Sequence, residues 1–166
     1  MANSSSKNRI EAIRLRDMTE SDAKIIFDWR NSSFIVDRST SRSTVEWSGH
    51  VQWMQKIVTD PSYVPFIIEL GKQPIGQIRY DKLDTDSFTI TSYLDEKYTG
   101  KGYGVTSIQK GNQIILERYG DVSIYAFVRK ANQLGNRAFP KAGFQRAIHP
   151  STPEDHNVYL FSGVDL

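Results

Sequence analysis

The chain has 166 residues, of which 39% are hydrophobic, and this is enough for one domain with a packed core. Its 21 Lys and Arg residues nearly balance 19 Asp and Glu residues, so the net charge of +2 predicts no nucleic-acid partner. The absence of Cys excludes disulfides, thiolate metal sites and a cysteine nucleophile, and it fits the reducing cytoplasm.

Residues 1–9 are polar, and we expect them to form a disordered tail before a single domain at residues 10–166. The tail lacks the apolar segment of a signal peptide. Since no apolar run approaches the ~20 residues of a membrane span, we expect no membrane partner. The three His residues lack the spacing of metal ligands, so we expect no metal.

The first half of the chain alternates between helical and extended patterns. In chain order these patterns predict a strand at 13–15, a helix from the capping box at 19–22 to about 29, a polar loop at 30–42, a helix from 43 to about 59, and strands at 64–70, 73–83 and 87–94. Turns at Gly71-Lys72 and at residues 84–86 join the last three strands into an antiparallel meander.

The second half begins with a glycine-rich loop and continues with helices and strands. Its patterns predict a helix that ends at Gly120, a strand at 122–128, a helix after Asn132 that Pro140 cuts or kinks, strands at 144–148 and 157–164, and a loop at 149–156.

Three alternate glycines, Gly100, Gly102 and Gly104, lie between a predicted strand and a predicted helix. Glycine lets the backbone approach a ligand closely, and free amide groups at a helix start bind phosphate. The spacing excludes a Walker A loop, because Gly102 stands where Ser or Thr is needed. It also excludes a Rossmann fingerprint, whose third glycine would fall at Val105 or Ser107. A pyrophosphate cradle is the prediction, and a plain turn is the alternative.

Thr99, Gly102 and Gly104 resemble the acyl-coenzyme A loop of the GCN5-related N-acetyltransferases, with Thr99 at a position where that family has Arg or Gln. The segment from Asn132 to Phe144 is similar to the family's late signature of Asn, an aromatic residue, Lys, Gly and Phe. The resemblance covers nearly the whole chain. It implies a mixed α/β fold with a mostly antiparallel sheet of about seven strands, a V-shaped splay and about four flanking helices.

The resemblance also implies acetyl-CoA as the cofactor and direct transfer of the acetyl group to a primary amine in a ternary complex. Pantetheine would enter the splay and pair with the backbone of the strand before the loop. The expected cofactor-binding residues are Ser92, Tyr93, Leu94, Thr99, Gly100, Lys101, Gly102, Tyr103, Gly104, Val105, Asn132 and Phe139.

The acid–base residues are less clear than the residues that hold the cofactor. Many family members use a Tyr in the late helix to protonate the thiolate, but the corresponding residue here is Phe139, and the strand at 87–94 has no Glu. The catalytic candidates are Asp81, His50 and Tyr93. Their alternatives are a solvated or turn-capping carboxylate, a structural hydrogen bond and simple packing, respectively. With Phe139 in place of Tyr, the proton for the thiolate would come from water, from the incoming ammonium or from another residue.

The segment Asp28-Trp29-Arg30-Asn31, followed by His50-x-x-Trp53, resembles a subset that acetylates amino groups on nucleotide-linked deoxyamino sugars. The expected substrate-binding residues are Arg30, Asn31, Trp53 and Arg79. Core packing and a helix-dipole contact are the alternatives for the Trp residues and for Arg30. Other candidate functions are acetylation of a ribosomal-protein N-terminus, a non-catalytic acyl-CoA or nucleotide sensor, and a scaffold that binds nothing. The expected partner is a small-molecule amine, with the protein as a monomer or homodimer.

Overall fold

A seven-stranded sheet in the order β1-β2-β3-β4-β5-β7-β6 forms the centre of the computed structural model, which describes residues 4–163. Its strands are β1 (Ile13–Asp17), β2 (Tyr63–Leu70), β3 (Gln73–Asp84), β4 (Ser87–Leu94), β5 (Ser123–Arg129), β6 (Gln145–Arg146) and β7 (His156–Ser162). All neighbouring strands are antiparallel except β4 and β5, so the predicted mixed fold is confirmed.

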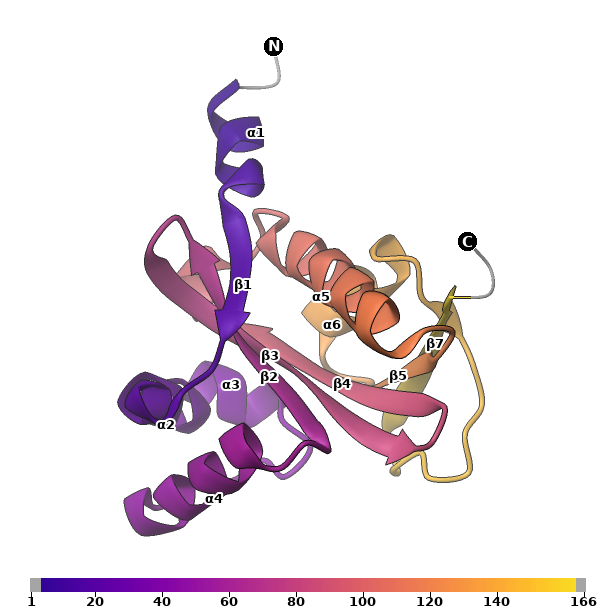
Figure 1. Ribbon diagram of the computed structural model, residues 1–166, viewed down its shortest axis with the longest axis horizontal. Coiled ribbons are helices and arrows are strands. Elements are labelled where there is room, and N and C mark those ends of the chain that lie inside the picture. Colours follow the sequence, from indigo (N-terminus) through magenta and orange to yellow (C-terminus); the bar gives the residue numbers. More distant parts are fainter. Residues whose placement is uncertain (1–3, 164–166) are drawn as a thin grey trace.

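Helices cover both faces of the sheet (Figure 1). The helices are α1 (Ser4–Glu11), α2 (Ala23–Asn31), α3 (Ser33–Arg38), α4 (Trp47–Thr59), α5 (Tyr103–Tyr119) and α6 (Gln133–Lys141). Short 3-10 turns lie at Glu20–Asp22 and Glu96–Tyr98. Helices α2 and α4 pack on one face of the meander, and α5 packs on the other.

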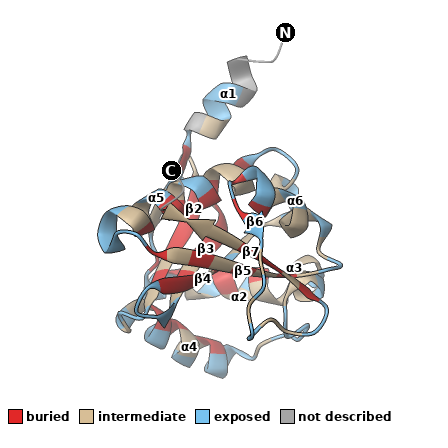
Figure 2. Ribbon diagram, turned by 90° about the vertical axis from the view of Figure 1, so that its right-hand side faces the viewer, coloured by how far each residue is buried: buried red, intermediate tan, exposed pale blue. Residues whose placement is uncertain are grey.

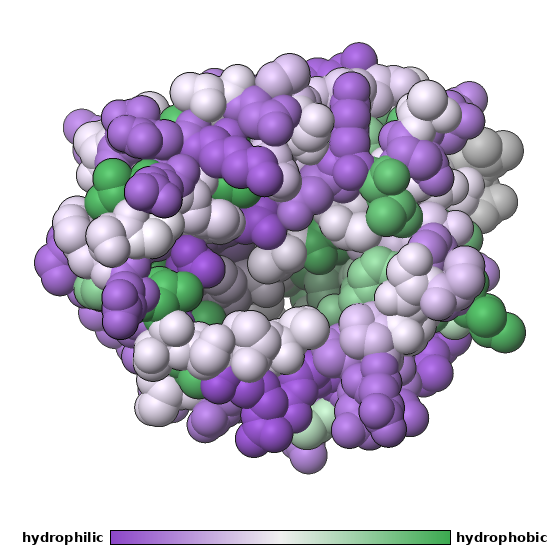
Figure 3. All heavy atoms as spheres, turned by 90° about the horizontal axis from the view of Figure 1, so that it is seen from below, coloured by the Kyte–Doolittle hydropathy of each residue, from purple (hydrophilic) through white to green (hydrophobic). Residues whose placement is uncertain are grey.

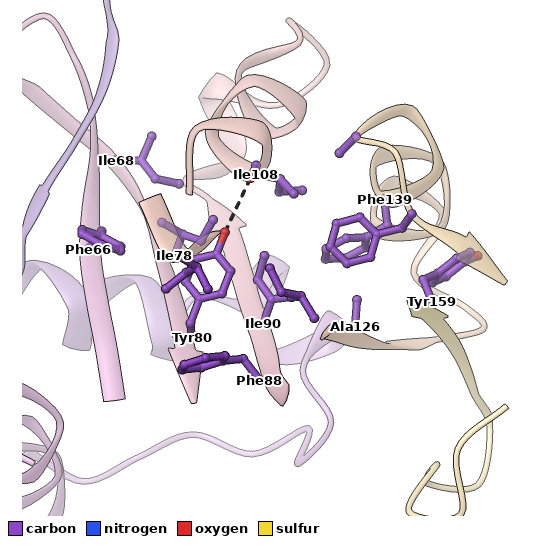
Figure 4. Close-up of a cluster of buried hydrophobic side chains, with 14 of the residues drawn as sticks. Phe66, Ile68, Ile78, Tyr80, Phe88, Ile90, Ile108, Ala126, Phe139 and Tyr159 are labelled. Carbon is purple, nitrogen blue, oxygen red and sulfur yellow. Dashed lines mark hydrogen bonds between the residues drawn. The ribbon is translucent and has the colours of Figure 1, made fainter. Parts of the chain in front are cut away.

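Alternation along the strands creates a core on each face, because successive strand residues point to opposite sides. On β2, Phe66 and Ile68 point to the larger core under α5 and α6, whereas Ile67 packs against α2 and α4. The buried residues of Figure 2 follow the strands of the sheet. Figure 4 shows the larger core, where Tyr80 lies between the sheet and α5.

Strands β4 and β5 are paired over only three residues, Ser87–Thr89 with Ser123–Tyr125. Beyond Thr89, β4 continues along β3 as far as Leu94, but no further described residue of β4 pairs with β5. The sheet therefore opens into the expected V. This opening exposes one edge of the last five residues of β4, because their backbone has a strand neighbour on one side only.

Two segments near the N-terminus differ from the expectation. The predicted loop at 30–42 contains α3. Ser32 is the N-cap of this helix, and its Oγ accepts a hydrogen bond from the amide of Ile35, which is itself buried. The predicted disordered tail contains α1, a helix that projects from the body in Figure 1. Residues 1–3 of that tail lie outside the described residues, and Ile10 packs against the larger core.

Other element boundaries in the structure also differ from those predicted from the sequence. Helix α4 begins at Trp47 and not at Ser43, because Glu46 has extended backbone angles and acts as the N-cap. The strand predicted at 144–148 is reduced to β6, since its last residue, Ile148, is 97% exposed and has no partner strand. The end of the strand predicted at 157–164 lies partly outside the described residues.

Candidate active site

A cavity of about 730 Å³ occupies the opening of the V and extends toward α2 and α4. Figure 3 shows the surface hollowed at this place, with hydrophilic and hydrophobic residues around the opening. Its wall includes the outer end of β4, the end of β5, the glycine loop with the start of α5, the start of α6, and the segment from Phe34 to Val45. We call this last segment the strap.

The start of α5 has the geometry of an anion cradle. Gly102 is its N-cap and has a left-handed backbone with φ of 84°, which favours glycine. The first amide groups of a helix have no partner within the helix, and the dipole adds positive potential there. A Cβ atom on Gly104 would meet only Leu94 at 3.8 Å, and one on Gly100 would meet nothing within 4 Å, so the loop leaves open space on its outer side. These residues fit the pyrophosphate of coenzyme A.

Most of the expected cofactor-binding residues line this cavity. They are Ser92, Tyr93, Leu94, Thr99, Gly100, Gly102, Gly104, Val105, Asn132 and Phe139. Two others do not. Tyr103 is buried in the larger core, and the Lys101 ammonium group donates to the Lys97 carbonyl at 3.3 Å, away from the cavity wall.

Two of these residues also have structural roles. The Asn132 side chain is the N-cap of α6 and accepts a hydrogen bond from the Gly135 amide at 3.1 Å. Phe139 packs edge-on against Phe144, with ring centroids 5.1 Å apart. The cavity-lining cations Arg137 and Lys141 lie on the same helix and were not identified from the sequence.

At the other end of the cavity, two guanidinium groups lie near one indole ring. The Arg30 guanidinium carbon lies 4.1 Å from the Trp53 ring centroid, and that of Arg79 lies 5.3 Å from it. Both contacts are within the range of a cation–π interaction. All three residues, which the sequence predicted to bind the substrate, line the cavity. They come from α2, α4 and β3, so the fold alone brings them together.

The last expected substrate-binding residue, Asn31, does not line the cavity. Its side chain donates to the Val45 carbonyl at 2.9 Å and accepts from the Val45 amide at 2.7 Å, so it fixes the end of the strap against α2.

His50 also lies outside the cavity, with 1% of its surface exposed. Its Nε2 lies 2.7 Å from the Ala23 carbonyl and its Nδ1 lies 3.2 Å from an Arg30 nitrogen, so both ring nitrogens are occupied. Burial lowers its pKa, and Arg30 adds to this effect, against the Ala23 hydrogen bond. This position argues against the general-base role suggested by the sequence.

Asp81 is held by a bidentate ion pair with Arg79, at 2.7 and 3.0 Å, and does not line the cavity. A carboxylate in such a pair already has its oxygens occupied by donors. The geometry therefore argues against Asp81 as a free base, and it identifies the residue as the counter-ion of Arg79.

Tyr93 is the one catalytic candidate in the cavity wall. Its hydroxyl donates to Gln77 Oε1 at 2.8 Å. Burial raises the pKa of Tyr93 well above its ordinary value, although Arg30 and Arg79 oppose the shift. The phenol therefore stays protonated at neutral pH, where it can donate a hydrogen bond but cannot act as a base.

Positive charge dominates the lining of the cavity. Its charged residues are Arg30, Arg38, Arg79, Arg129, Arg137 and Lys141, and no described Asp or Glu is among the lining residues. Only Arg79 of these six forms an ion pair with a described carboxylate. Such a site favours anionic ligands, because field lines concentrate in a low-dielectric cleft.

The strap closes the cavity toward the second half of the sheet. Arg129 Nη1 donates to the Asp37 carbonyl at 2.5 Å, and the Thr40 hydroxyl lies 3.0 Å from His156 Nε2. Phe34 and Arg38 also line the cavity from α3. Sequence patterns missed these residues because a polar segment with weak periodicity reads as a loop.

No group of three or more His, Cys, Asp or Glu side chains in residues 4–163 is placed to hold a metal ion. In the same residues, no helix has the length and apolar character needed to cross a bilayer.

The sequence profile described as the acetyltransferase (GNAT) domain matches residues 12–145. An aminoglycoside N(6′)-acetyltransferase type 1 of Klebsiella pneumoniae is 24% identical, and the alignment covers 92% of this chain and 84% of the relative.

Two solved structures share the fold. One is the aminoglycoside acetyltransferase AAC(6′)-Ib with coenzyme A, at a TM-score of 0.79 and 23% identity, covering 92% of this chain and 95% of the other. The second is RimL, a ribosomal L7/L12 α-N-protein acetyltransferase with coenzyme A, at 0.78 and 16%, covering 91% and 94%. With its profile match, its splayed sheet and its glycine cradle, the chain belongs to the GNAT acetyltransferase family.

Proposed function

We propose that this protein, an acetyl-CoA-dependent N-acetyltransferase by its family, acetylates the primary amine of a small anionic acceptor, and that a nucleotide-linked amino sugar is that acceptor. The charge of the cavity carries the proposal. Five lining cations lack an internal counter-ion, and the cofactor cannot engage all of them, since Arg30 lies at the α2–α4 end, away from the glycine cradle. A diphosphate suits this end, because guanidinium groups bind phosphate oxygens in pairs.

The reaction needs few groups from the protein. The neutral amine nitrogen attacks the thioester carbonyl carbon, the C–S bond breaks, the nitrogen loses a proton, and the sulfur gains one. Ser92, Tyr93 and Leu94 lie on the open edge of β4, where backbone groups can hold pantetheine. Tyr93 is the proposed donor to the departing sulfur, because its side chain lines the cavity and the proton that it gives can be replaced by the one that the nitrogen loses. Holding both substrates together supplies much of the rate.

Two other acceptors follow from the relatives and are less well supported. Aminoglycosides carry several positive charges, and a cavity whose described lining has six cations and no carboxylate repels them. A protein N-terminus, the substrate named for RimL, makes no use of the charge of Arg30, which has no described counter-ion. A non-catalytic acyl-CoA sensor would need no site for an acceptor. The cluster of Arg30, Arg79 and Trp53, built from three elements at the far end of the cavity, would then have no use.

The test is turnover of purified protein with acetyl-CoA and three acceptors: a UDP-linked amino sugar with a free amine, an aminoglycoside, and an N-terminal peptide. We expect release of coenzyme A and an added acetyl group with the first acceptor only. Turnover of the peptide or the aminoglycoside, with the UDP-sugar inert, contradicts the proposal. Binding of acetyl-CoA without turnover of any amine supports the sensor.

The Arg30→Gln variant tests whether this end of the cavity binds the acceptor. It should raise KM for the UDP-sugar by ~10- to 100-fold, because a hydrogen bond to a charged group is lost, and leave KM for acetyl-CoA nearly unchanged. The matched Arg146→Gln variant changes an exposed arginine on β6 and should leave both constants as they are. We place the reaction in the cytoplasm as part of the same proposal, with residues 10–166 as one catalytic domain.

A further inference from the structure

The two sequence segments that suggested the acceptor meet in one hydrogen-bonded unit. The end of α2 supplies Arg30, and the first turns of α4 supply His50 and Trp53. His50 stacks on Trp53 with ring centroids 5.6 Å apart, and Arg30 lies over the same indole at 4.1 Å. The proposed function uses the arginine and the indole, but it leaves the buried imidazole without a role.

The hydrogen bonds of His50 determine its tautomer. The Ala23 carbonyl, 2.7 Å from Nε2, can only accept, so Nε2 carries the proton. Nδ1 therefore has a free electron pair, and it faces Arg30 Nη1 at 3.2 Å. Since a guanidinium can only donate, Arg30 donates to Nδ1. Burial favours this neutral form, because it lowers the pKa of His50.

This arrangement fixes Arg30 without neutralising it. Arg30 forms no ion pair with a described Asp or Glu, and its side chain contacts the neutral imidazole and the indole ring. Arg79, the other guanidinium near Trp53, has its charge balanced by Asp81 at 2.7 Å. A carboxylate in place of the imidazole would cancel the charge that an anionic acceptor needs.

We infer that His50 is a positioning residue for the acceptor: its neutral imidazole, anchored on the Ala23 carbonyl, holds the Arg30 guanidinium at the cavity wall and leaves the positive charge free for a phosphate of the acceptor. The inference deepens the proposed function and rests on it for the identity of the acceptor. It gives the His-x-x-Trp segment a task in binding, and it assigns no proton transfer to His50.

Two substitutions separate the two hydrogen bonds of the imidazole. In His50→Asn, Oδ1 takes the position of Nδ1 and keeps an acceptor for Arg30, while the donor to Ala23 is lost. In His50→Gln, the amide nitrogen reaches the position of Nε2 and keeps the donor to Ala23, while the acceptor for Arg30 is lost. The probe is UDP, titrated by calorimetry into protein saturated with coenzyme A, so that the nucleotide cannot occupy the cofactor site.

We expect His50→Gln to raise the Kd for UDP about tenfold and His50→Asn to change it less than about threefold. In an Arg30→Gln background, His50→Gln should have no further effect, because the imidazole acts only through the arginine. Melting temperatures monitor folding. Equal losses in both variants, losses that follow the melting temperature, or additive effects with Arg30→Gln overturn the inference.

Failure of the proposed function gives a different result. If the parent protein binds UDP and His50→Gln weakens that binding, but no UDP-linked amino sugar is acetylated, the inference stands and the acceptor is another phosphate-bearing amine or none. If the parent does not bind UDP at all, the anion site itself is absent and the inference is wrong, whatever the turnover assays show.

Discussion

Cationic side chains in the cavity differ in whether the protein neutralises them. Arg79 is paired with Asp81, whereas Arg30, Arg38 and Arg129 contact rings, carbonyl groups or an imidazole. A ligand that enters this cavity therefore meets charge that is not balanced within the site. No described carboxylate lies in the cavity wall. An acceptor amine in this cavity therefore has no described neighbouring Asp or Glu to take its proton.

We expect kcat/KM for the acceptor to rise with pH in step with the neutral fraction of its amine and to level off above the pKa of that amine. The reason is that no described lining residue is a carboxylate, and the Tyr93 phenol, with its raised pKa, keeps its proton. Profiles for two acceptors with different amine pKa values check this. A break at the same pH for both acceptors would indicate a base on the protein.

Tyr93→Phe should lower kcat by ~10- to 100-fold and change KM for acetyl-CoA little, because the proton donor for the departing sulfur is lost. Steady-state kinetics at saturating acceptor measure the effect. Tyr63→Phe is the control, since this hydroxyl lies at the start of β2 and outside the cavity lining. An unchanged kcat in Tyr93→Phe would mean that water protonates the thiolate.

Elements that a short local pattern determines could be predicted from the sequence. The meander, the glycine loop and α5 follow from alternation, from Gly100 to Gly104 and from helical periodicity, and the structure has all of them. Helix α3 was missed because it has only six residues, and its three hydrophobic residues, Phe34, Ile35 and Val36, are consecutive and show no helical spacing. The contact of Thr40 with His156 joins residues 116 positions apart, and a local pattern carries no information about such a pair.

The same difference between local patterns and contacts with other residues applies to the candidate site. The glycine loop could be placed from the sequence because its conformation is a property of the loop itself. The catalytic roles of His50 and Asp81 stay predictions that the geometry argues against. The partners of His50 lie on another helix, α2, whereas Asp81 pairs with Arg79 two residues away on β3. Sequence spacing gives the element on which a residue lies, but it does not give the partner that its side chain meets.

Glycine-to-alanine substitutions in two helices should have opposite effects on stability. On α5, a Cβ at Gly111 would overlap the Tyr80 hydroxyl, so we expect Gly111→Ala to destabilise the protein by about 1–3 kcal/mol. On α4, Gly49 is exposed and a Cβ there meets nothing within 4 Å, so Gly49→Ala should stabilise by about 0.5–1 kcal/mol. Urea unfolding of both variants measures these free energies, and effects of the same sign would contradict the packing described for α5.

For the whole molecule, charge is unevenly distributed. The net charge is only +2, yet six cations gather around one cavity. At saturating acetyl-CoA, we expect KM for an anionic acceptor to rise several-fold between ~50 and ~500 mM NaCl, because salt screens charges over shorter distances as its concentration increases. A neutral amine acceptor serves as the control, and an equal rise for both acceptors would show that salt acts on the fold or on the cofactor.

The two halves of the sheet are joined at both sides of the cavity. On one side β4 and β5 pair over Ser87–Thr89, and on the other the strap reaches Arg129 and His156. We therefore expect a ligand to enter the cavity by one end. An internal lysine of a folded protein, flanked by chain in both directions, would then fit less well than the proposed acceptor, whose amine lies at one free tip.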